Sequence, residues 1–247
     1  MADVLVSARG VSVRFGGLVA VDGVDLDVRA GELVGIIGPN GAGKTTFFHA
    51  LSGLLAPTAG RLTIGGIDLT GRAPHVFAAH GVARTFQTPR VFRDMTVRAN
   101  VDFALRFAGR RRTAVHELAR DARSILDFVG LGDVTGVTAG ALTPARQRLL
   151  ELGMAIGVRP CLLLLDEVAA GLSEHETMAM TALIRGLRDT LGIAVIWVEH
   201  AVRALMTAVD RVVVLHQGRK LADGRPADVA RAAAVIEIYL GEPSEVR

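Results

Sequence analysis

Four short segments of the chain are apolar at nearly every position and lack the alternation that marks a half-exposed strand. They cover residues 33–38, 161–165, 193–198 and 212–215. Continuous apolar runs of this length are typical of parallel strands that helices cover on both faces. Residues 174–191, which lie between two of these runs, have helical periodicity. The alternation of apolar runs with helical segments predicts an α/β core around a parallel sheet.

The beginning of the chain has a different pattern, in which polar and apolar residues alternate. The alternation covers residues 4–15 and 24–28, and the segment RLTIGGI at 61–67 follows a turn that contains proline and glycine. A period of two is typical of strands with one exposed face. These segments predict an antiparallel sheet layer at one side of the core, so the architecture combines parallel and antiparallel strands.

The middle of the chain, at about residues 90–157, is expected to form a helical lobe inserted into the α/β core. Apolar residues recur there at spacings of three and four and stop at Gly130; they are Val115, Leu118, Ala119, Ala122, Ile125, Leu126 and Val129. This spacing predicts an amphipathic helix with a glycine stop. We expect a single domain over residues 4–241.

Composition and charge narrow the class of protein. Half of the 247 residues are hydrophobic, which is enough for a substantial core. No apolar stretch reaches the roughly 18 residues that a membrane-spanning helix needs, and the first residues lack the features of a secretory signal. The formal net charge is only +3 and aromatic residues make up 4% of the chain, which is weak support for nucleic-acid binding. We expect a cytoplasmic protein without a nucleic-acid partner.

A glycine-rich segment, GPNGAGKTT at 38–46, follows the first apolar run and matches the pattern GxxxxGK[ST]. A predicted strand precedes it and a predicted helix begins near Lys44, which is the context of a phosphate-binding P-loop. Its glycines let successive amides point at phosphate oxygens, while Lys44 supplies a point charge and Thr45 offers its hydroxyl to Mg²⁺. The alternative is a glycine-rich turn without a ligand. The predicted nucleotide-binding residues are Gly38, Pro39, Asn40, Gly41, Ala42, Gly43, Lys44, Thr45 and Thr46.

Two carboxylates directly follow the apolar run CLLLL. Ligands of open α/β sheets bind at the carboxyl ends of the strands, so these acids are expected beside the phosphate loop. Asp166 is the candidate partner of Mg²⁺, directly or through a water ligand. Glu167 is the candidate that polarises a water for attack on the terminal phosphate. The alternative for Glu167 is a salt-bridged acid in a loop.

Five segments together resemble the nucleotide-binding subunits of ATP-binding cassette (ABC) transporters, over about residues 4–241. They are GPNGAGKTT, RTFQ at 84–87, LLLLDE at 162–167, AAGLS at 169–173 and WVEH at 197–200. Three further segments are most similar to the ATPase subunits of branched-chain amino acid importers: FGGLVAVDGV, GVARTFQTPRVFRDMTV and YLGE. ATPases of transporters for urea or short amides and for lipopolysaccharide export have similar sequences and are the alternatives.

The resemblance implies an ATPase that uses ATP and Mg²⁺ to power transport. It assigns Gln87 to contacts with Mg²⁺ and the attacking water, and His200 to the terminal phosphate and the geometry of that water. It also sets Phe15 against adenine, although a core phenylalanine is the alternative. The implied partners are a second ABC ATPase subunit, integral-membrane permease subunits and, indirectly, a periplasmic-type substrate-binding protein. The protein would then lie on the cytoplasmic face of the membrane through the permease.

One segment departs from the family. The signature of the family reads LSGGQQR, whereas residues 142–148 read LTPARQR. Thr143 keeps a hydroxyl that can cap a helix and Pro144 suits the first turn, but Pro144 lacks an amide donor and Ala145 adds a methyl group. Arg146 supplies a positive charge whose direction the sequence leaves open.

In the family, each signature completes the nucleotide site of the opposing subunit. The degenerate segment at residues 142–148 therefore predicts a heterodimer with one competent site. A subunit that binds ATP with negligible hydrolysis is the alternative.

Overall fold

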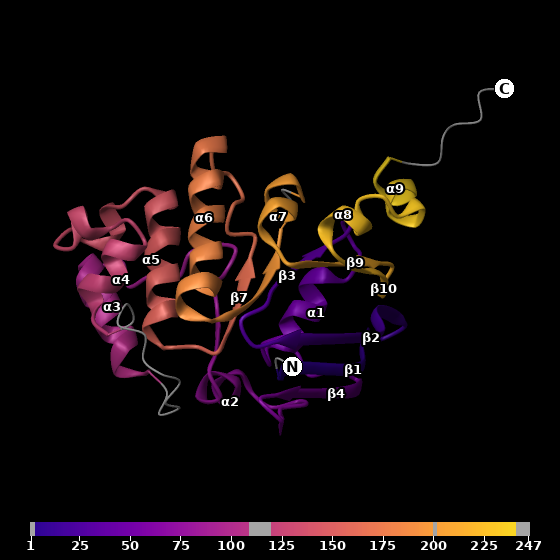
Figure 1. The fold of residues 1–247 in the computed structure, drawn as a ribbon. Coiled ribbons are helices and arrows are strands. Elements are labelled where there is room, and N and C mark those ends of the chain that lie inside the picture. Colours follow the sequence, from indigo (N-terminus) through magenta and orange to yellow (C-terminus); the bar gives the residue numbers. More distant parts are fainter. Residues whose placement is uncertain (1–2, 109–119, 200–201, 241–247) are drawn as a thin grey trace.

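The computed structural model describes residues 3–108, 120–199 and 202–240, which form two sheets flanked by helices (Figure 1). The larger sheet has the strand order β10-β9-β3-β8-β7-β6. Its strands are β3 (Leu33–Ile37), β6 (Val82–Arg84), β7 (Leu162–Asp166), β8 (Ala194–Val198), β9 (Arg211–His216) and β10 (Arg219–Gly224). Neighbouring strands from β6 to β9 are parallel, and β10 pairs with β9 in the antiparallel sense. The predicted α/β core is confirmed.

Strand β7 explains the run of leucines that ends in two acids. All of its residues are buried. Leu162 and Leu164 belong to the apolar core on one face of the sheet, whereas Leu163 and Leu165 belong to the core on the other face. Because both faces are covered, the four positions before Asp166 are all apolar. The strand begins one residue later than the predicted run and includes Asp166.

The smaller sheet is antiparallel, as predicted, in the order β2-β1-β4-β5. Its strands are β1 (Val4–Phe15), β2 (Leu18–Arg29), β4 (Ala59–Ile64) and β5 (Ile67–Asp68). Strand β2 starts earlier than the predicted segment 24–28. A tight turn in which Gly16 has a φ of 57° brings Leu18 opposite Phe15, so pairing begins at the turn.

Helices cover the large sheet and form a group at one end of the molecule. The described helices are α1 (Lys44–Leu51), α2 (Pro74–Ala79), α3 (Val97–Arg106), α4 (Ala122–Phe128), α5 (Pro144–Gly157), α6 (Glu174–Leu191), α7 (Val202–Ala208), α8 (Pro226–Val229) and α9 (Ala233–Leu240), with short 3₁₀ turns at Gly132–Val134 and Ala139–Ala141. Helix α6 has the predicted bounds because Ser173 forms a capping box with Glu176 and Gly192 ends the helix in a left-handed conformation.

The region predicted as a helical lobe contains α3, α4 and α5, which lie at the opposite end of the molecule from β1 and β2 (Figure 1). Buried residues of these helices, such as Val101, Ile125 and Leu150, belong to the same apolar core as β7 and β8. Helix α4 begins at Ala122, with Asp121 as its N-cap. The predicted positions Val115, Leu118 and Ala119 lie outside the described residues. The boundaries of the lobe and of the domain at 4–241 stay predictions.

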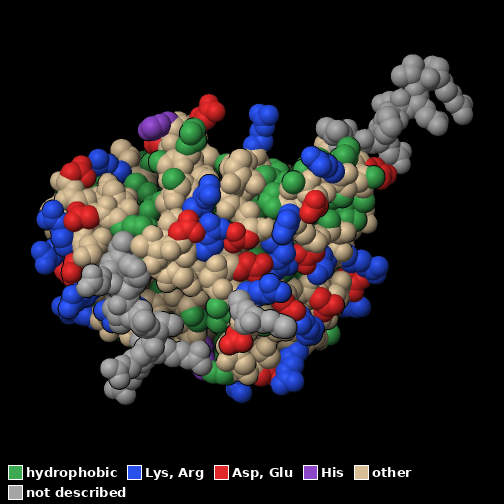
Figure 2. Space-filling model, in the orientation of Figure 1, with side chains coloured by type: hydrophobic (Ala, Val, Ile, Leu, Met, Phe, Trp, Pro, Cys, Tyr) green, Lys and Arg blue, Asp and Glu red, His purple; other side chains and the backbone are tan. Residues whose placement is uncertain are grey.

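The surface carries mixed charge. On the face shown in Figure 2, Lys and Arg side chains are interspersed with Asp and Glu, notably around β2 and β10. Among the described residues, no helix combines the length and apolar character that crossing a membrane requires.

Candidate nucleotide-binding site

The predicted phosphate loop connects the end of β3 to the start of α1. Gly38 has a φ of 154°, and a Cβ there would lie 2.2 Å from the carbonyl oxygen of Leu215 on β9. At Gly43, with a φ of 95°, a Cβ would lie 2.4 Å from the carbonyl oxygen of Ala20. Only glycine fits these two positions. The loop therefore curls tightly into α1, whose first amides have no acceptors within the helix and are available to an anion.

Lys44 lies folded back on this loop. Its buried ammonium donates to the carbonyl oxygens of Gly38 at 2.7 Å and Pro39 at 3.0 Å. Burial lowers the pKa of Lys44, while the negative charge of Glu167 raises it. An incoming phosphate can replace the two carbonyl oxygens and form a stronger, charge-assisted bond with the ammonium.

A pocket of about 530 Å³ opens over the loop. Its described walls come from the loop, from the β1–β2 turn and from the β9–β10 turn; they are Phe15, Leu18, Val19, Ala20, Asn40, Gly41, Ala42, Gly43, Lys44, Thr45, Thr46, Gln217 and Gly218. The Phe15 residue is 51% exposed at this pocket, so it is not a core phenylalanine. Its stacking on adenine stays a prediction.

The two predicted carboxylates differ in environment. Asp166 is buried at the end of β7. Glu167 has a φ of 48°, a left-handed conformation that residues with a Cβ rarely adopt, and its amide donates to the Val198 carbonyl at 2.9 Å. Gln87, 80 residues earlier in the chain, donates from Nε2 to Glu167 Oε2 at 2.7 Å. The fold thus brings Gln87 and Glu167 together, and the charge of Glu167 acts on Lys44.

Arg84 joins this group although the sequence alone did not single it out. It ends β6, where it pairs with Leu164 of the neighbouring β7. Its Nη2 lies 3.3 Å from Asp166 Oδ2, and the two side chains are 12% and 8% exposed. The available signal was an arginine at the end of a short apolar strand. That signal gives no partner, because the partner lies 82 residues later.

Comparison with known proteins decides the family. The family profile described as "ABC transporter" matches residues 21–170. The chain belongs to the ABC transporter family. It is 39% identical to the high-affinity branched-chain amino acid transport ATP-binding protein BraF of Pseudomonas aeruginosa, over 98% of this chain and 100% of that protein. The corresponding protein LivG of Escherichia coli K12 is 38% identical over the same shares.

Solved structures of ATP-binding cassettes have the same fold. A nucleotide-free ATP-binding cassette from an ABC transporter superposes with a TM-score of 0.83 and 27% identity, over 97% of this chain and 100% of that chain. The ADP conformation of an ATP-binding cassette of an ABC transporter gives a TM-score of 0.83 and 28% identity, with the same shares covered. This ABC transporter subunit is therefore an ATP-binding protein with the cassette fold.

The donor atoms of this ABC transporter cassette are of the type that Mg²⁺ prefers. Thr45 offers a hydroxyl at the start of α1, Asp166 a carboxylate at the end of β7, and Gln87 an amide oxygen beside Glu167. Mg²⁺ binds through one or two carboxylates together with nucleotide phosphates. The residues present fit the ion. Within the described part of the chain, no group of three or more His, Cys, Asp or Glu residues is arranged to hold a metal.

The degenerate signature of this ABC transporter chain begins α5. The predicted cap is confirmed: Thr143 Oγ1 accepts the amide of Arg146 at 3.3 Å, and Pro144 occupies the first turn. The charge of Arg146 is directed to Asp133, with Nη2 to Oδ2 at 3.1 Å, a direction the sequence left open. None of the described residues that line the nucleotide pocket comes from the segment Thr143, Pro144, Ala145 and Arg146.

His200, the predicted switch histidine, lies outside the described residues. Its neighbour Glu199 is buried, and Glu199 Oε1 accepts the amide of Ala169 at 2.7 Å. Glu199 therefore ties the end of β8 to the segment that follows Glu167. The role of Glu199 could not be predicted, because an acid after an apolar run does not reveal a backbone donor 30 residues away.

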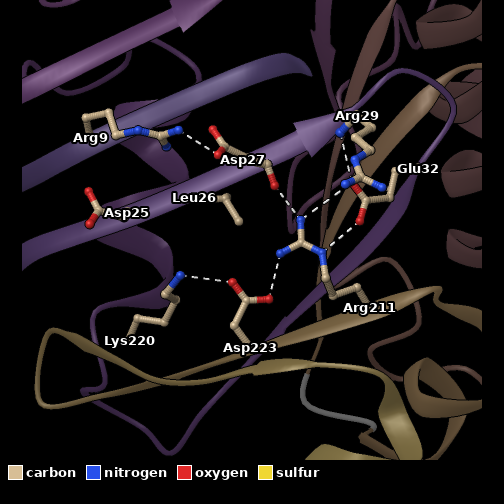
Figure 3. Close-up of a pocket in the computed structure, with 9 residues that line it drawn as sticks. All are labelled: Arg9, Asp25, Leu26, Asp27, Arg29, Glu32, Arg211, Lys220 and Asp223. Carbon is tan, nitrogen blue, oxygen red and sulfur yellow. Dashed lines mark hydrogen bonds and ion pairs between the residues drawn. The ribbon is translucent and has the colours of Figure 1, made fainter. Parts of the chain in front are cut away.

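A second pocket, of about 360 Å³, lies between the two sheets and is lined by charged residues (Figure 3). Arg211 is at its centre and binds Glu32 at 2.7 Å and Asp223 at 2.6 Å, while Lys220 binds Asp223 at 2.9 Å. These cations already have carboxylate partners, whereas the described hydrogen bonds of Lys44 go to the carbonyl oxygens of Gly38 and Pro39. We call this group of charged residues, Arg211, Glu32, Asp223 and Lys220, the inter-sheet clasp, because its ion pairs connect the two sheets.

Proposed function

We propose that this chain is the ATP-binding and ATP-hydrolysing subunit of an ABC importer for branched-chain amino acids. The observation that carries the proposal is the hydrogen bond from Gln87 to Glu167, whose charge acts on Lys44 of the phosphate loop. These three residues come from three separate segments and supply groups that phosphoryl transfer to water requires. The names of BraF and LivG support the substrate. Transporters for urea or short amides, or for lipopolysaccharide, are the alternatives.

Binding of ATP would use the phosphate loop and Phe15. The amides at the start of α1 and the ammonium of Lys44 hold the phosphates, and the Phe15 ring stacks on adenine. Thr45, Asp166 and Gln87 would hold Mg²⁺, which when bound would supply positive charge beside the phosphates. Catalysis at this site would consist of positioning and charge stabilisation.

Hydrolysis would depend on Glu167. Its carboxylate polarises a water for attack on the terminal phosphate, and the Gln87 amide fixes the orientation of that carboxylate through Oε2. The family resemblance assigns His200, which lies outside the described residues, a role at the terminal phosphate and the attacking water. Hydrolysis then reopens the closed dimer and drives alternating access of the permease.

Contact with the permease would come from the helical lobe near residues 87–97. A largely apolar groove of about 430 Å³ lies there, with aromatic walls that include Phe86, Phe92 and Phe103. Large exposed apolar patches are typical of interaction sites. The subunit would therefore lie on the cytoplasmic face of the membrane through the permease, and a periplasmic-type binding protein would deliver the substrate.

The altered signature favours pairing with a different ATPase. Pro144, at the first turn of α5, has no backbone N–H to donate to a phosphate. Ala145 carries a methyl group where the family has glycine. A partner with an intact signature would complete this chain's site, whereas the partner's own ATP would face residues 142–148. In a homodimer both sites would be impaired. The same departure supports a second candidate function, a regulatory subunit that binds ATP and hydrolyses it negligibly.

Glu167→Gln separates these two functions. In the reconstituted transporter, the substitution is expected to lower ATP turnover at least a hundredfold while ATP binding is retained, because the amide cannot accept a proton. Steady-state ATPase assays and equilibrium ATP binding measure the two effects. Unchanged turnover would mean that the active site belongs to the partner subunit. Transport assays of the wild-type complex with leucine, urea and short amides test the substrate.

A further inference from the structure

Arg84 is held on several sides within the molecule. Its guanidinium carbon lies 5.2 Å from the ring centroid of Phe48 and 4.6 Å from that of Phe86. Nη1 donates to Ser52 Oγ at 2.9 Å, and Ser52 is the C-cap residue of α1. A planar guanidinium with a ring contact and directed hydrogen bonds has little rotational freedom. Arg84 is therefore a rigid link between β6 and the helix that begins with Lys44 and Thr45.

This rigid link ends on Asp166. Nη2 of Arg84 lies 3.3 Å from Asp166 Oδ2. The backbone of Asp166 is held by the same segment, because its amide donates to Thr85 Oγ1 at 3.2 Å. Two consecutive residues of the chain thus fix both the main chain and one carboxylate oxygen of Asp166.

We propose that Arg84 is a positioning residue that orients the Asp166 carboxylate toward the divalent metal of the nucleotide complex. The proposal rests on the proposed function, in which Asp166 meets Mg²⁺. The bond to Oδ2 fixes the rotation of the carboxylate, so its other oxygen has a defined direction. Partners that orient metal-binding carboxylates typically contribute about tenfold to a hundredfold in metal affinity.

The charge and the geometry of Arg84 have opposite effects on the metal affinity of the site. A guanidinium near the metal repels it, so removal of the charge by itself favours cation binding. Arg84→Lys keeps the charge and removes the planar fork, because an ammonium cannot contact the Phe86 ring and at the same time donate to Ser52 and Asp166 at fixed angles. The lysine variant therefore isolates the orienting effect.

Arg90 offers a matched control. Its guanidinium carbon lies 4.6 Å from the ring centroid of Phe86, as that of Arg84 does, and both arginines line the same groove. The amide of Arg90 donates to Glu151 Oε1 at 2.9 Å and its guanidinium contacts Phe86, whereas the guanidinium of Arg84 binds Asp166. Arg90→Lys thus repeats the chemical change beside the same ring without touching the carboxylate.

The test measures Mn²⁺ affinity of the full chain saturated with the β,γ-imido analogue of ATP, by electron paramagnetic resonance of free Mn²⁺. Arg84→Lys is expected to weaken Mn²⁺ binding about tenfold, whereas Arg90→Lys stays within about twofold of wild type. Affinity for the analogue in EDTA should be unchanged in both. Equal Mn²⁺ affinity in the two lysine variants would overturn the proposal.

Two further variants keep the outcome interpretable. Asp166→Asn tests the proposed function itself: if it leaves Mn²⁺ affinity unchanged, the assignment of Asp166 fails together with the inference. If Asp166→Asn weakens Mn²⁺ and Arg84→Lys does not, only the inference fails. Should Arg84→Lys not fold, Ser52→Ala removes the Nη1 acceptor and is expected to weaken Mn²⁺ about threefold; wild-type affinity in that variant overturns the inference.

Discussion

Phenylalanine side chains in and near the nucleotide-binding site differ sharply in burial. Phe47 and Phe48 of α1 are fully buried in the core, whereas Phe15 lies half-exposed at the nucleotide pocket. An exposed ring over a phosphate loop contributes little to folding, because it buries little apolar area. We therefore expect the Phe15 ring to contribute to nucleotide binding.

Phe15→Ala tests whether this ring binds adenine. We expect ATP affinity to fall about tenfold, since aromatic stacking on a base contributes on the order of 1–3 kcal/mol. The free energy of unfolding should change by less than about 1 kcal/mol, because the ring is 51% exposed. Equilibrium ATP binding and urea unfolding measure these quantities, with Leu18→Ala in the same pocket as control. Unchanged ATP affinity of Phe15→Ala would contradict the binding role of the ring.

At the scale of elements, α5 holds the segment that carries Gln87. Glu151 of α5 accepts the amide of Phe86 at 3.4 Å and the amide of Arg90 at 2.9 Å, on both sides of Gln87. Glu151 is buried, and burial raises its pKa from 4.5 to about 7. The helix that begins with the degenerate signature therefore holds the segment around Gln87 through a titratable group.

The raised pKa of Glu151 predicts a pH dependence of stability. Between pH 4.5 and about 7 the folded chain retains a proton that the unfolded chain releases, so the free energy of unfolding falls as pH rises. The loss is on the order of 3 kcal/mol. Urea unfolding at pH 5 and pH 8 should show it as a difference relative to Glu151→Gln, which cannot titrate. A wild-type chain that gains stability over Glu151→Gln toward pH 8 would contradict the raised pKa.

At the scale of the whole molecule, the two sheets are joined by the clasp around Arg211 (Figure 3). Arg211 lies on β9, while Glu32 follows β2 and Asp223 lies on β10. Its guanidinium also donates to the carbonyl oxygen of Asp27 on β2. One side chain thus links the antiparallel layer to the edge of the parallel sheet.

Arg211→Met should destabilise the fold by about 2–3 kcal/mol, because it leaves the partly buried Glu32 without its cation and leaves Asp223 with Lys220 alone. Urea unfolding measures the change. Arg61→Met is the control: the Arg61–Asp68 pair is 68% and 43% exposed, and exposed pairs contribute about 0–1 kcal/mol. Equal effects of the two substitutions would show that the clasp contributes no more than a surface pair.

The sequence by itself determined the features that depend on near neighbours. The glycines at 38 and 43 and the following Lys44 predicted the phosphate loop, because the pattern encodes a backbone conformation. The leucines of β7 predicted a strand covered on both faces, and Thr143 with Pro144 predicted the start of α5. The ends of the strands were predicted less well, because they depend on pairing: β2 extends to Leu18 because the turn at Gly16 places Leu18 opposite Phe15.

Only the tertiary structure decided which distant side chains meet. Gln87 reaches Glu167, and Arg84 reaches Asp166, because β6 pairs with β7 although 77 residues separate the end of one from the start of the other. A crossover that long leaves no trace in local periodicity, since strand order depends on how the whole chain packs. The same holds for Arg146, whose neighbour Asp133 is supplied by the fold. The phosphate loop is local chemistry, whereas the carboxylates acquire their partners through the sheet.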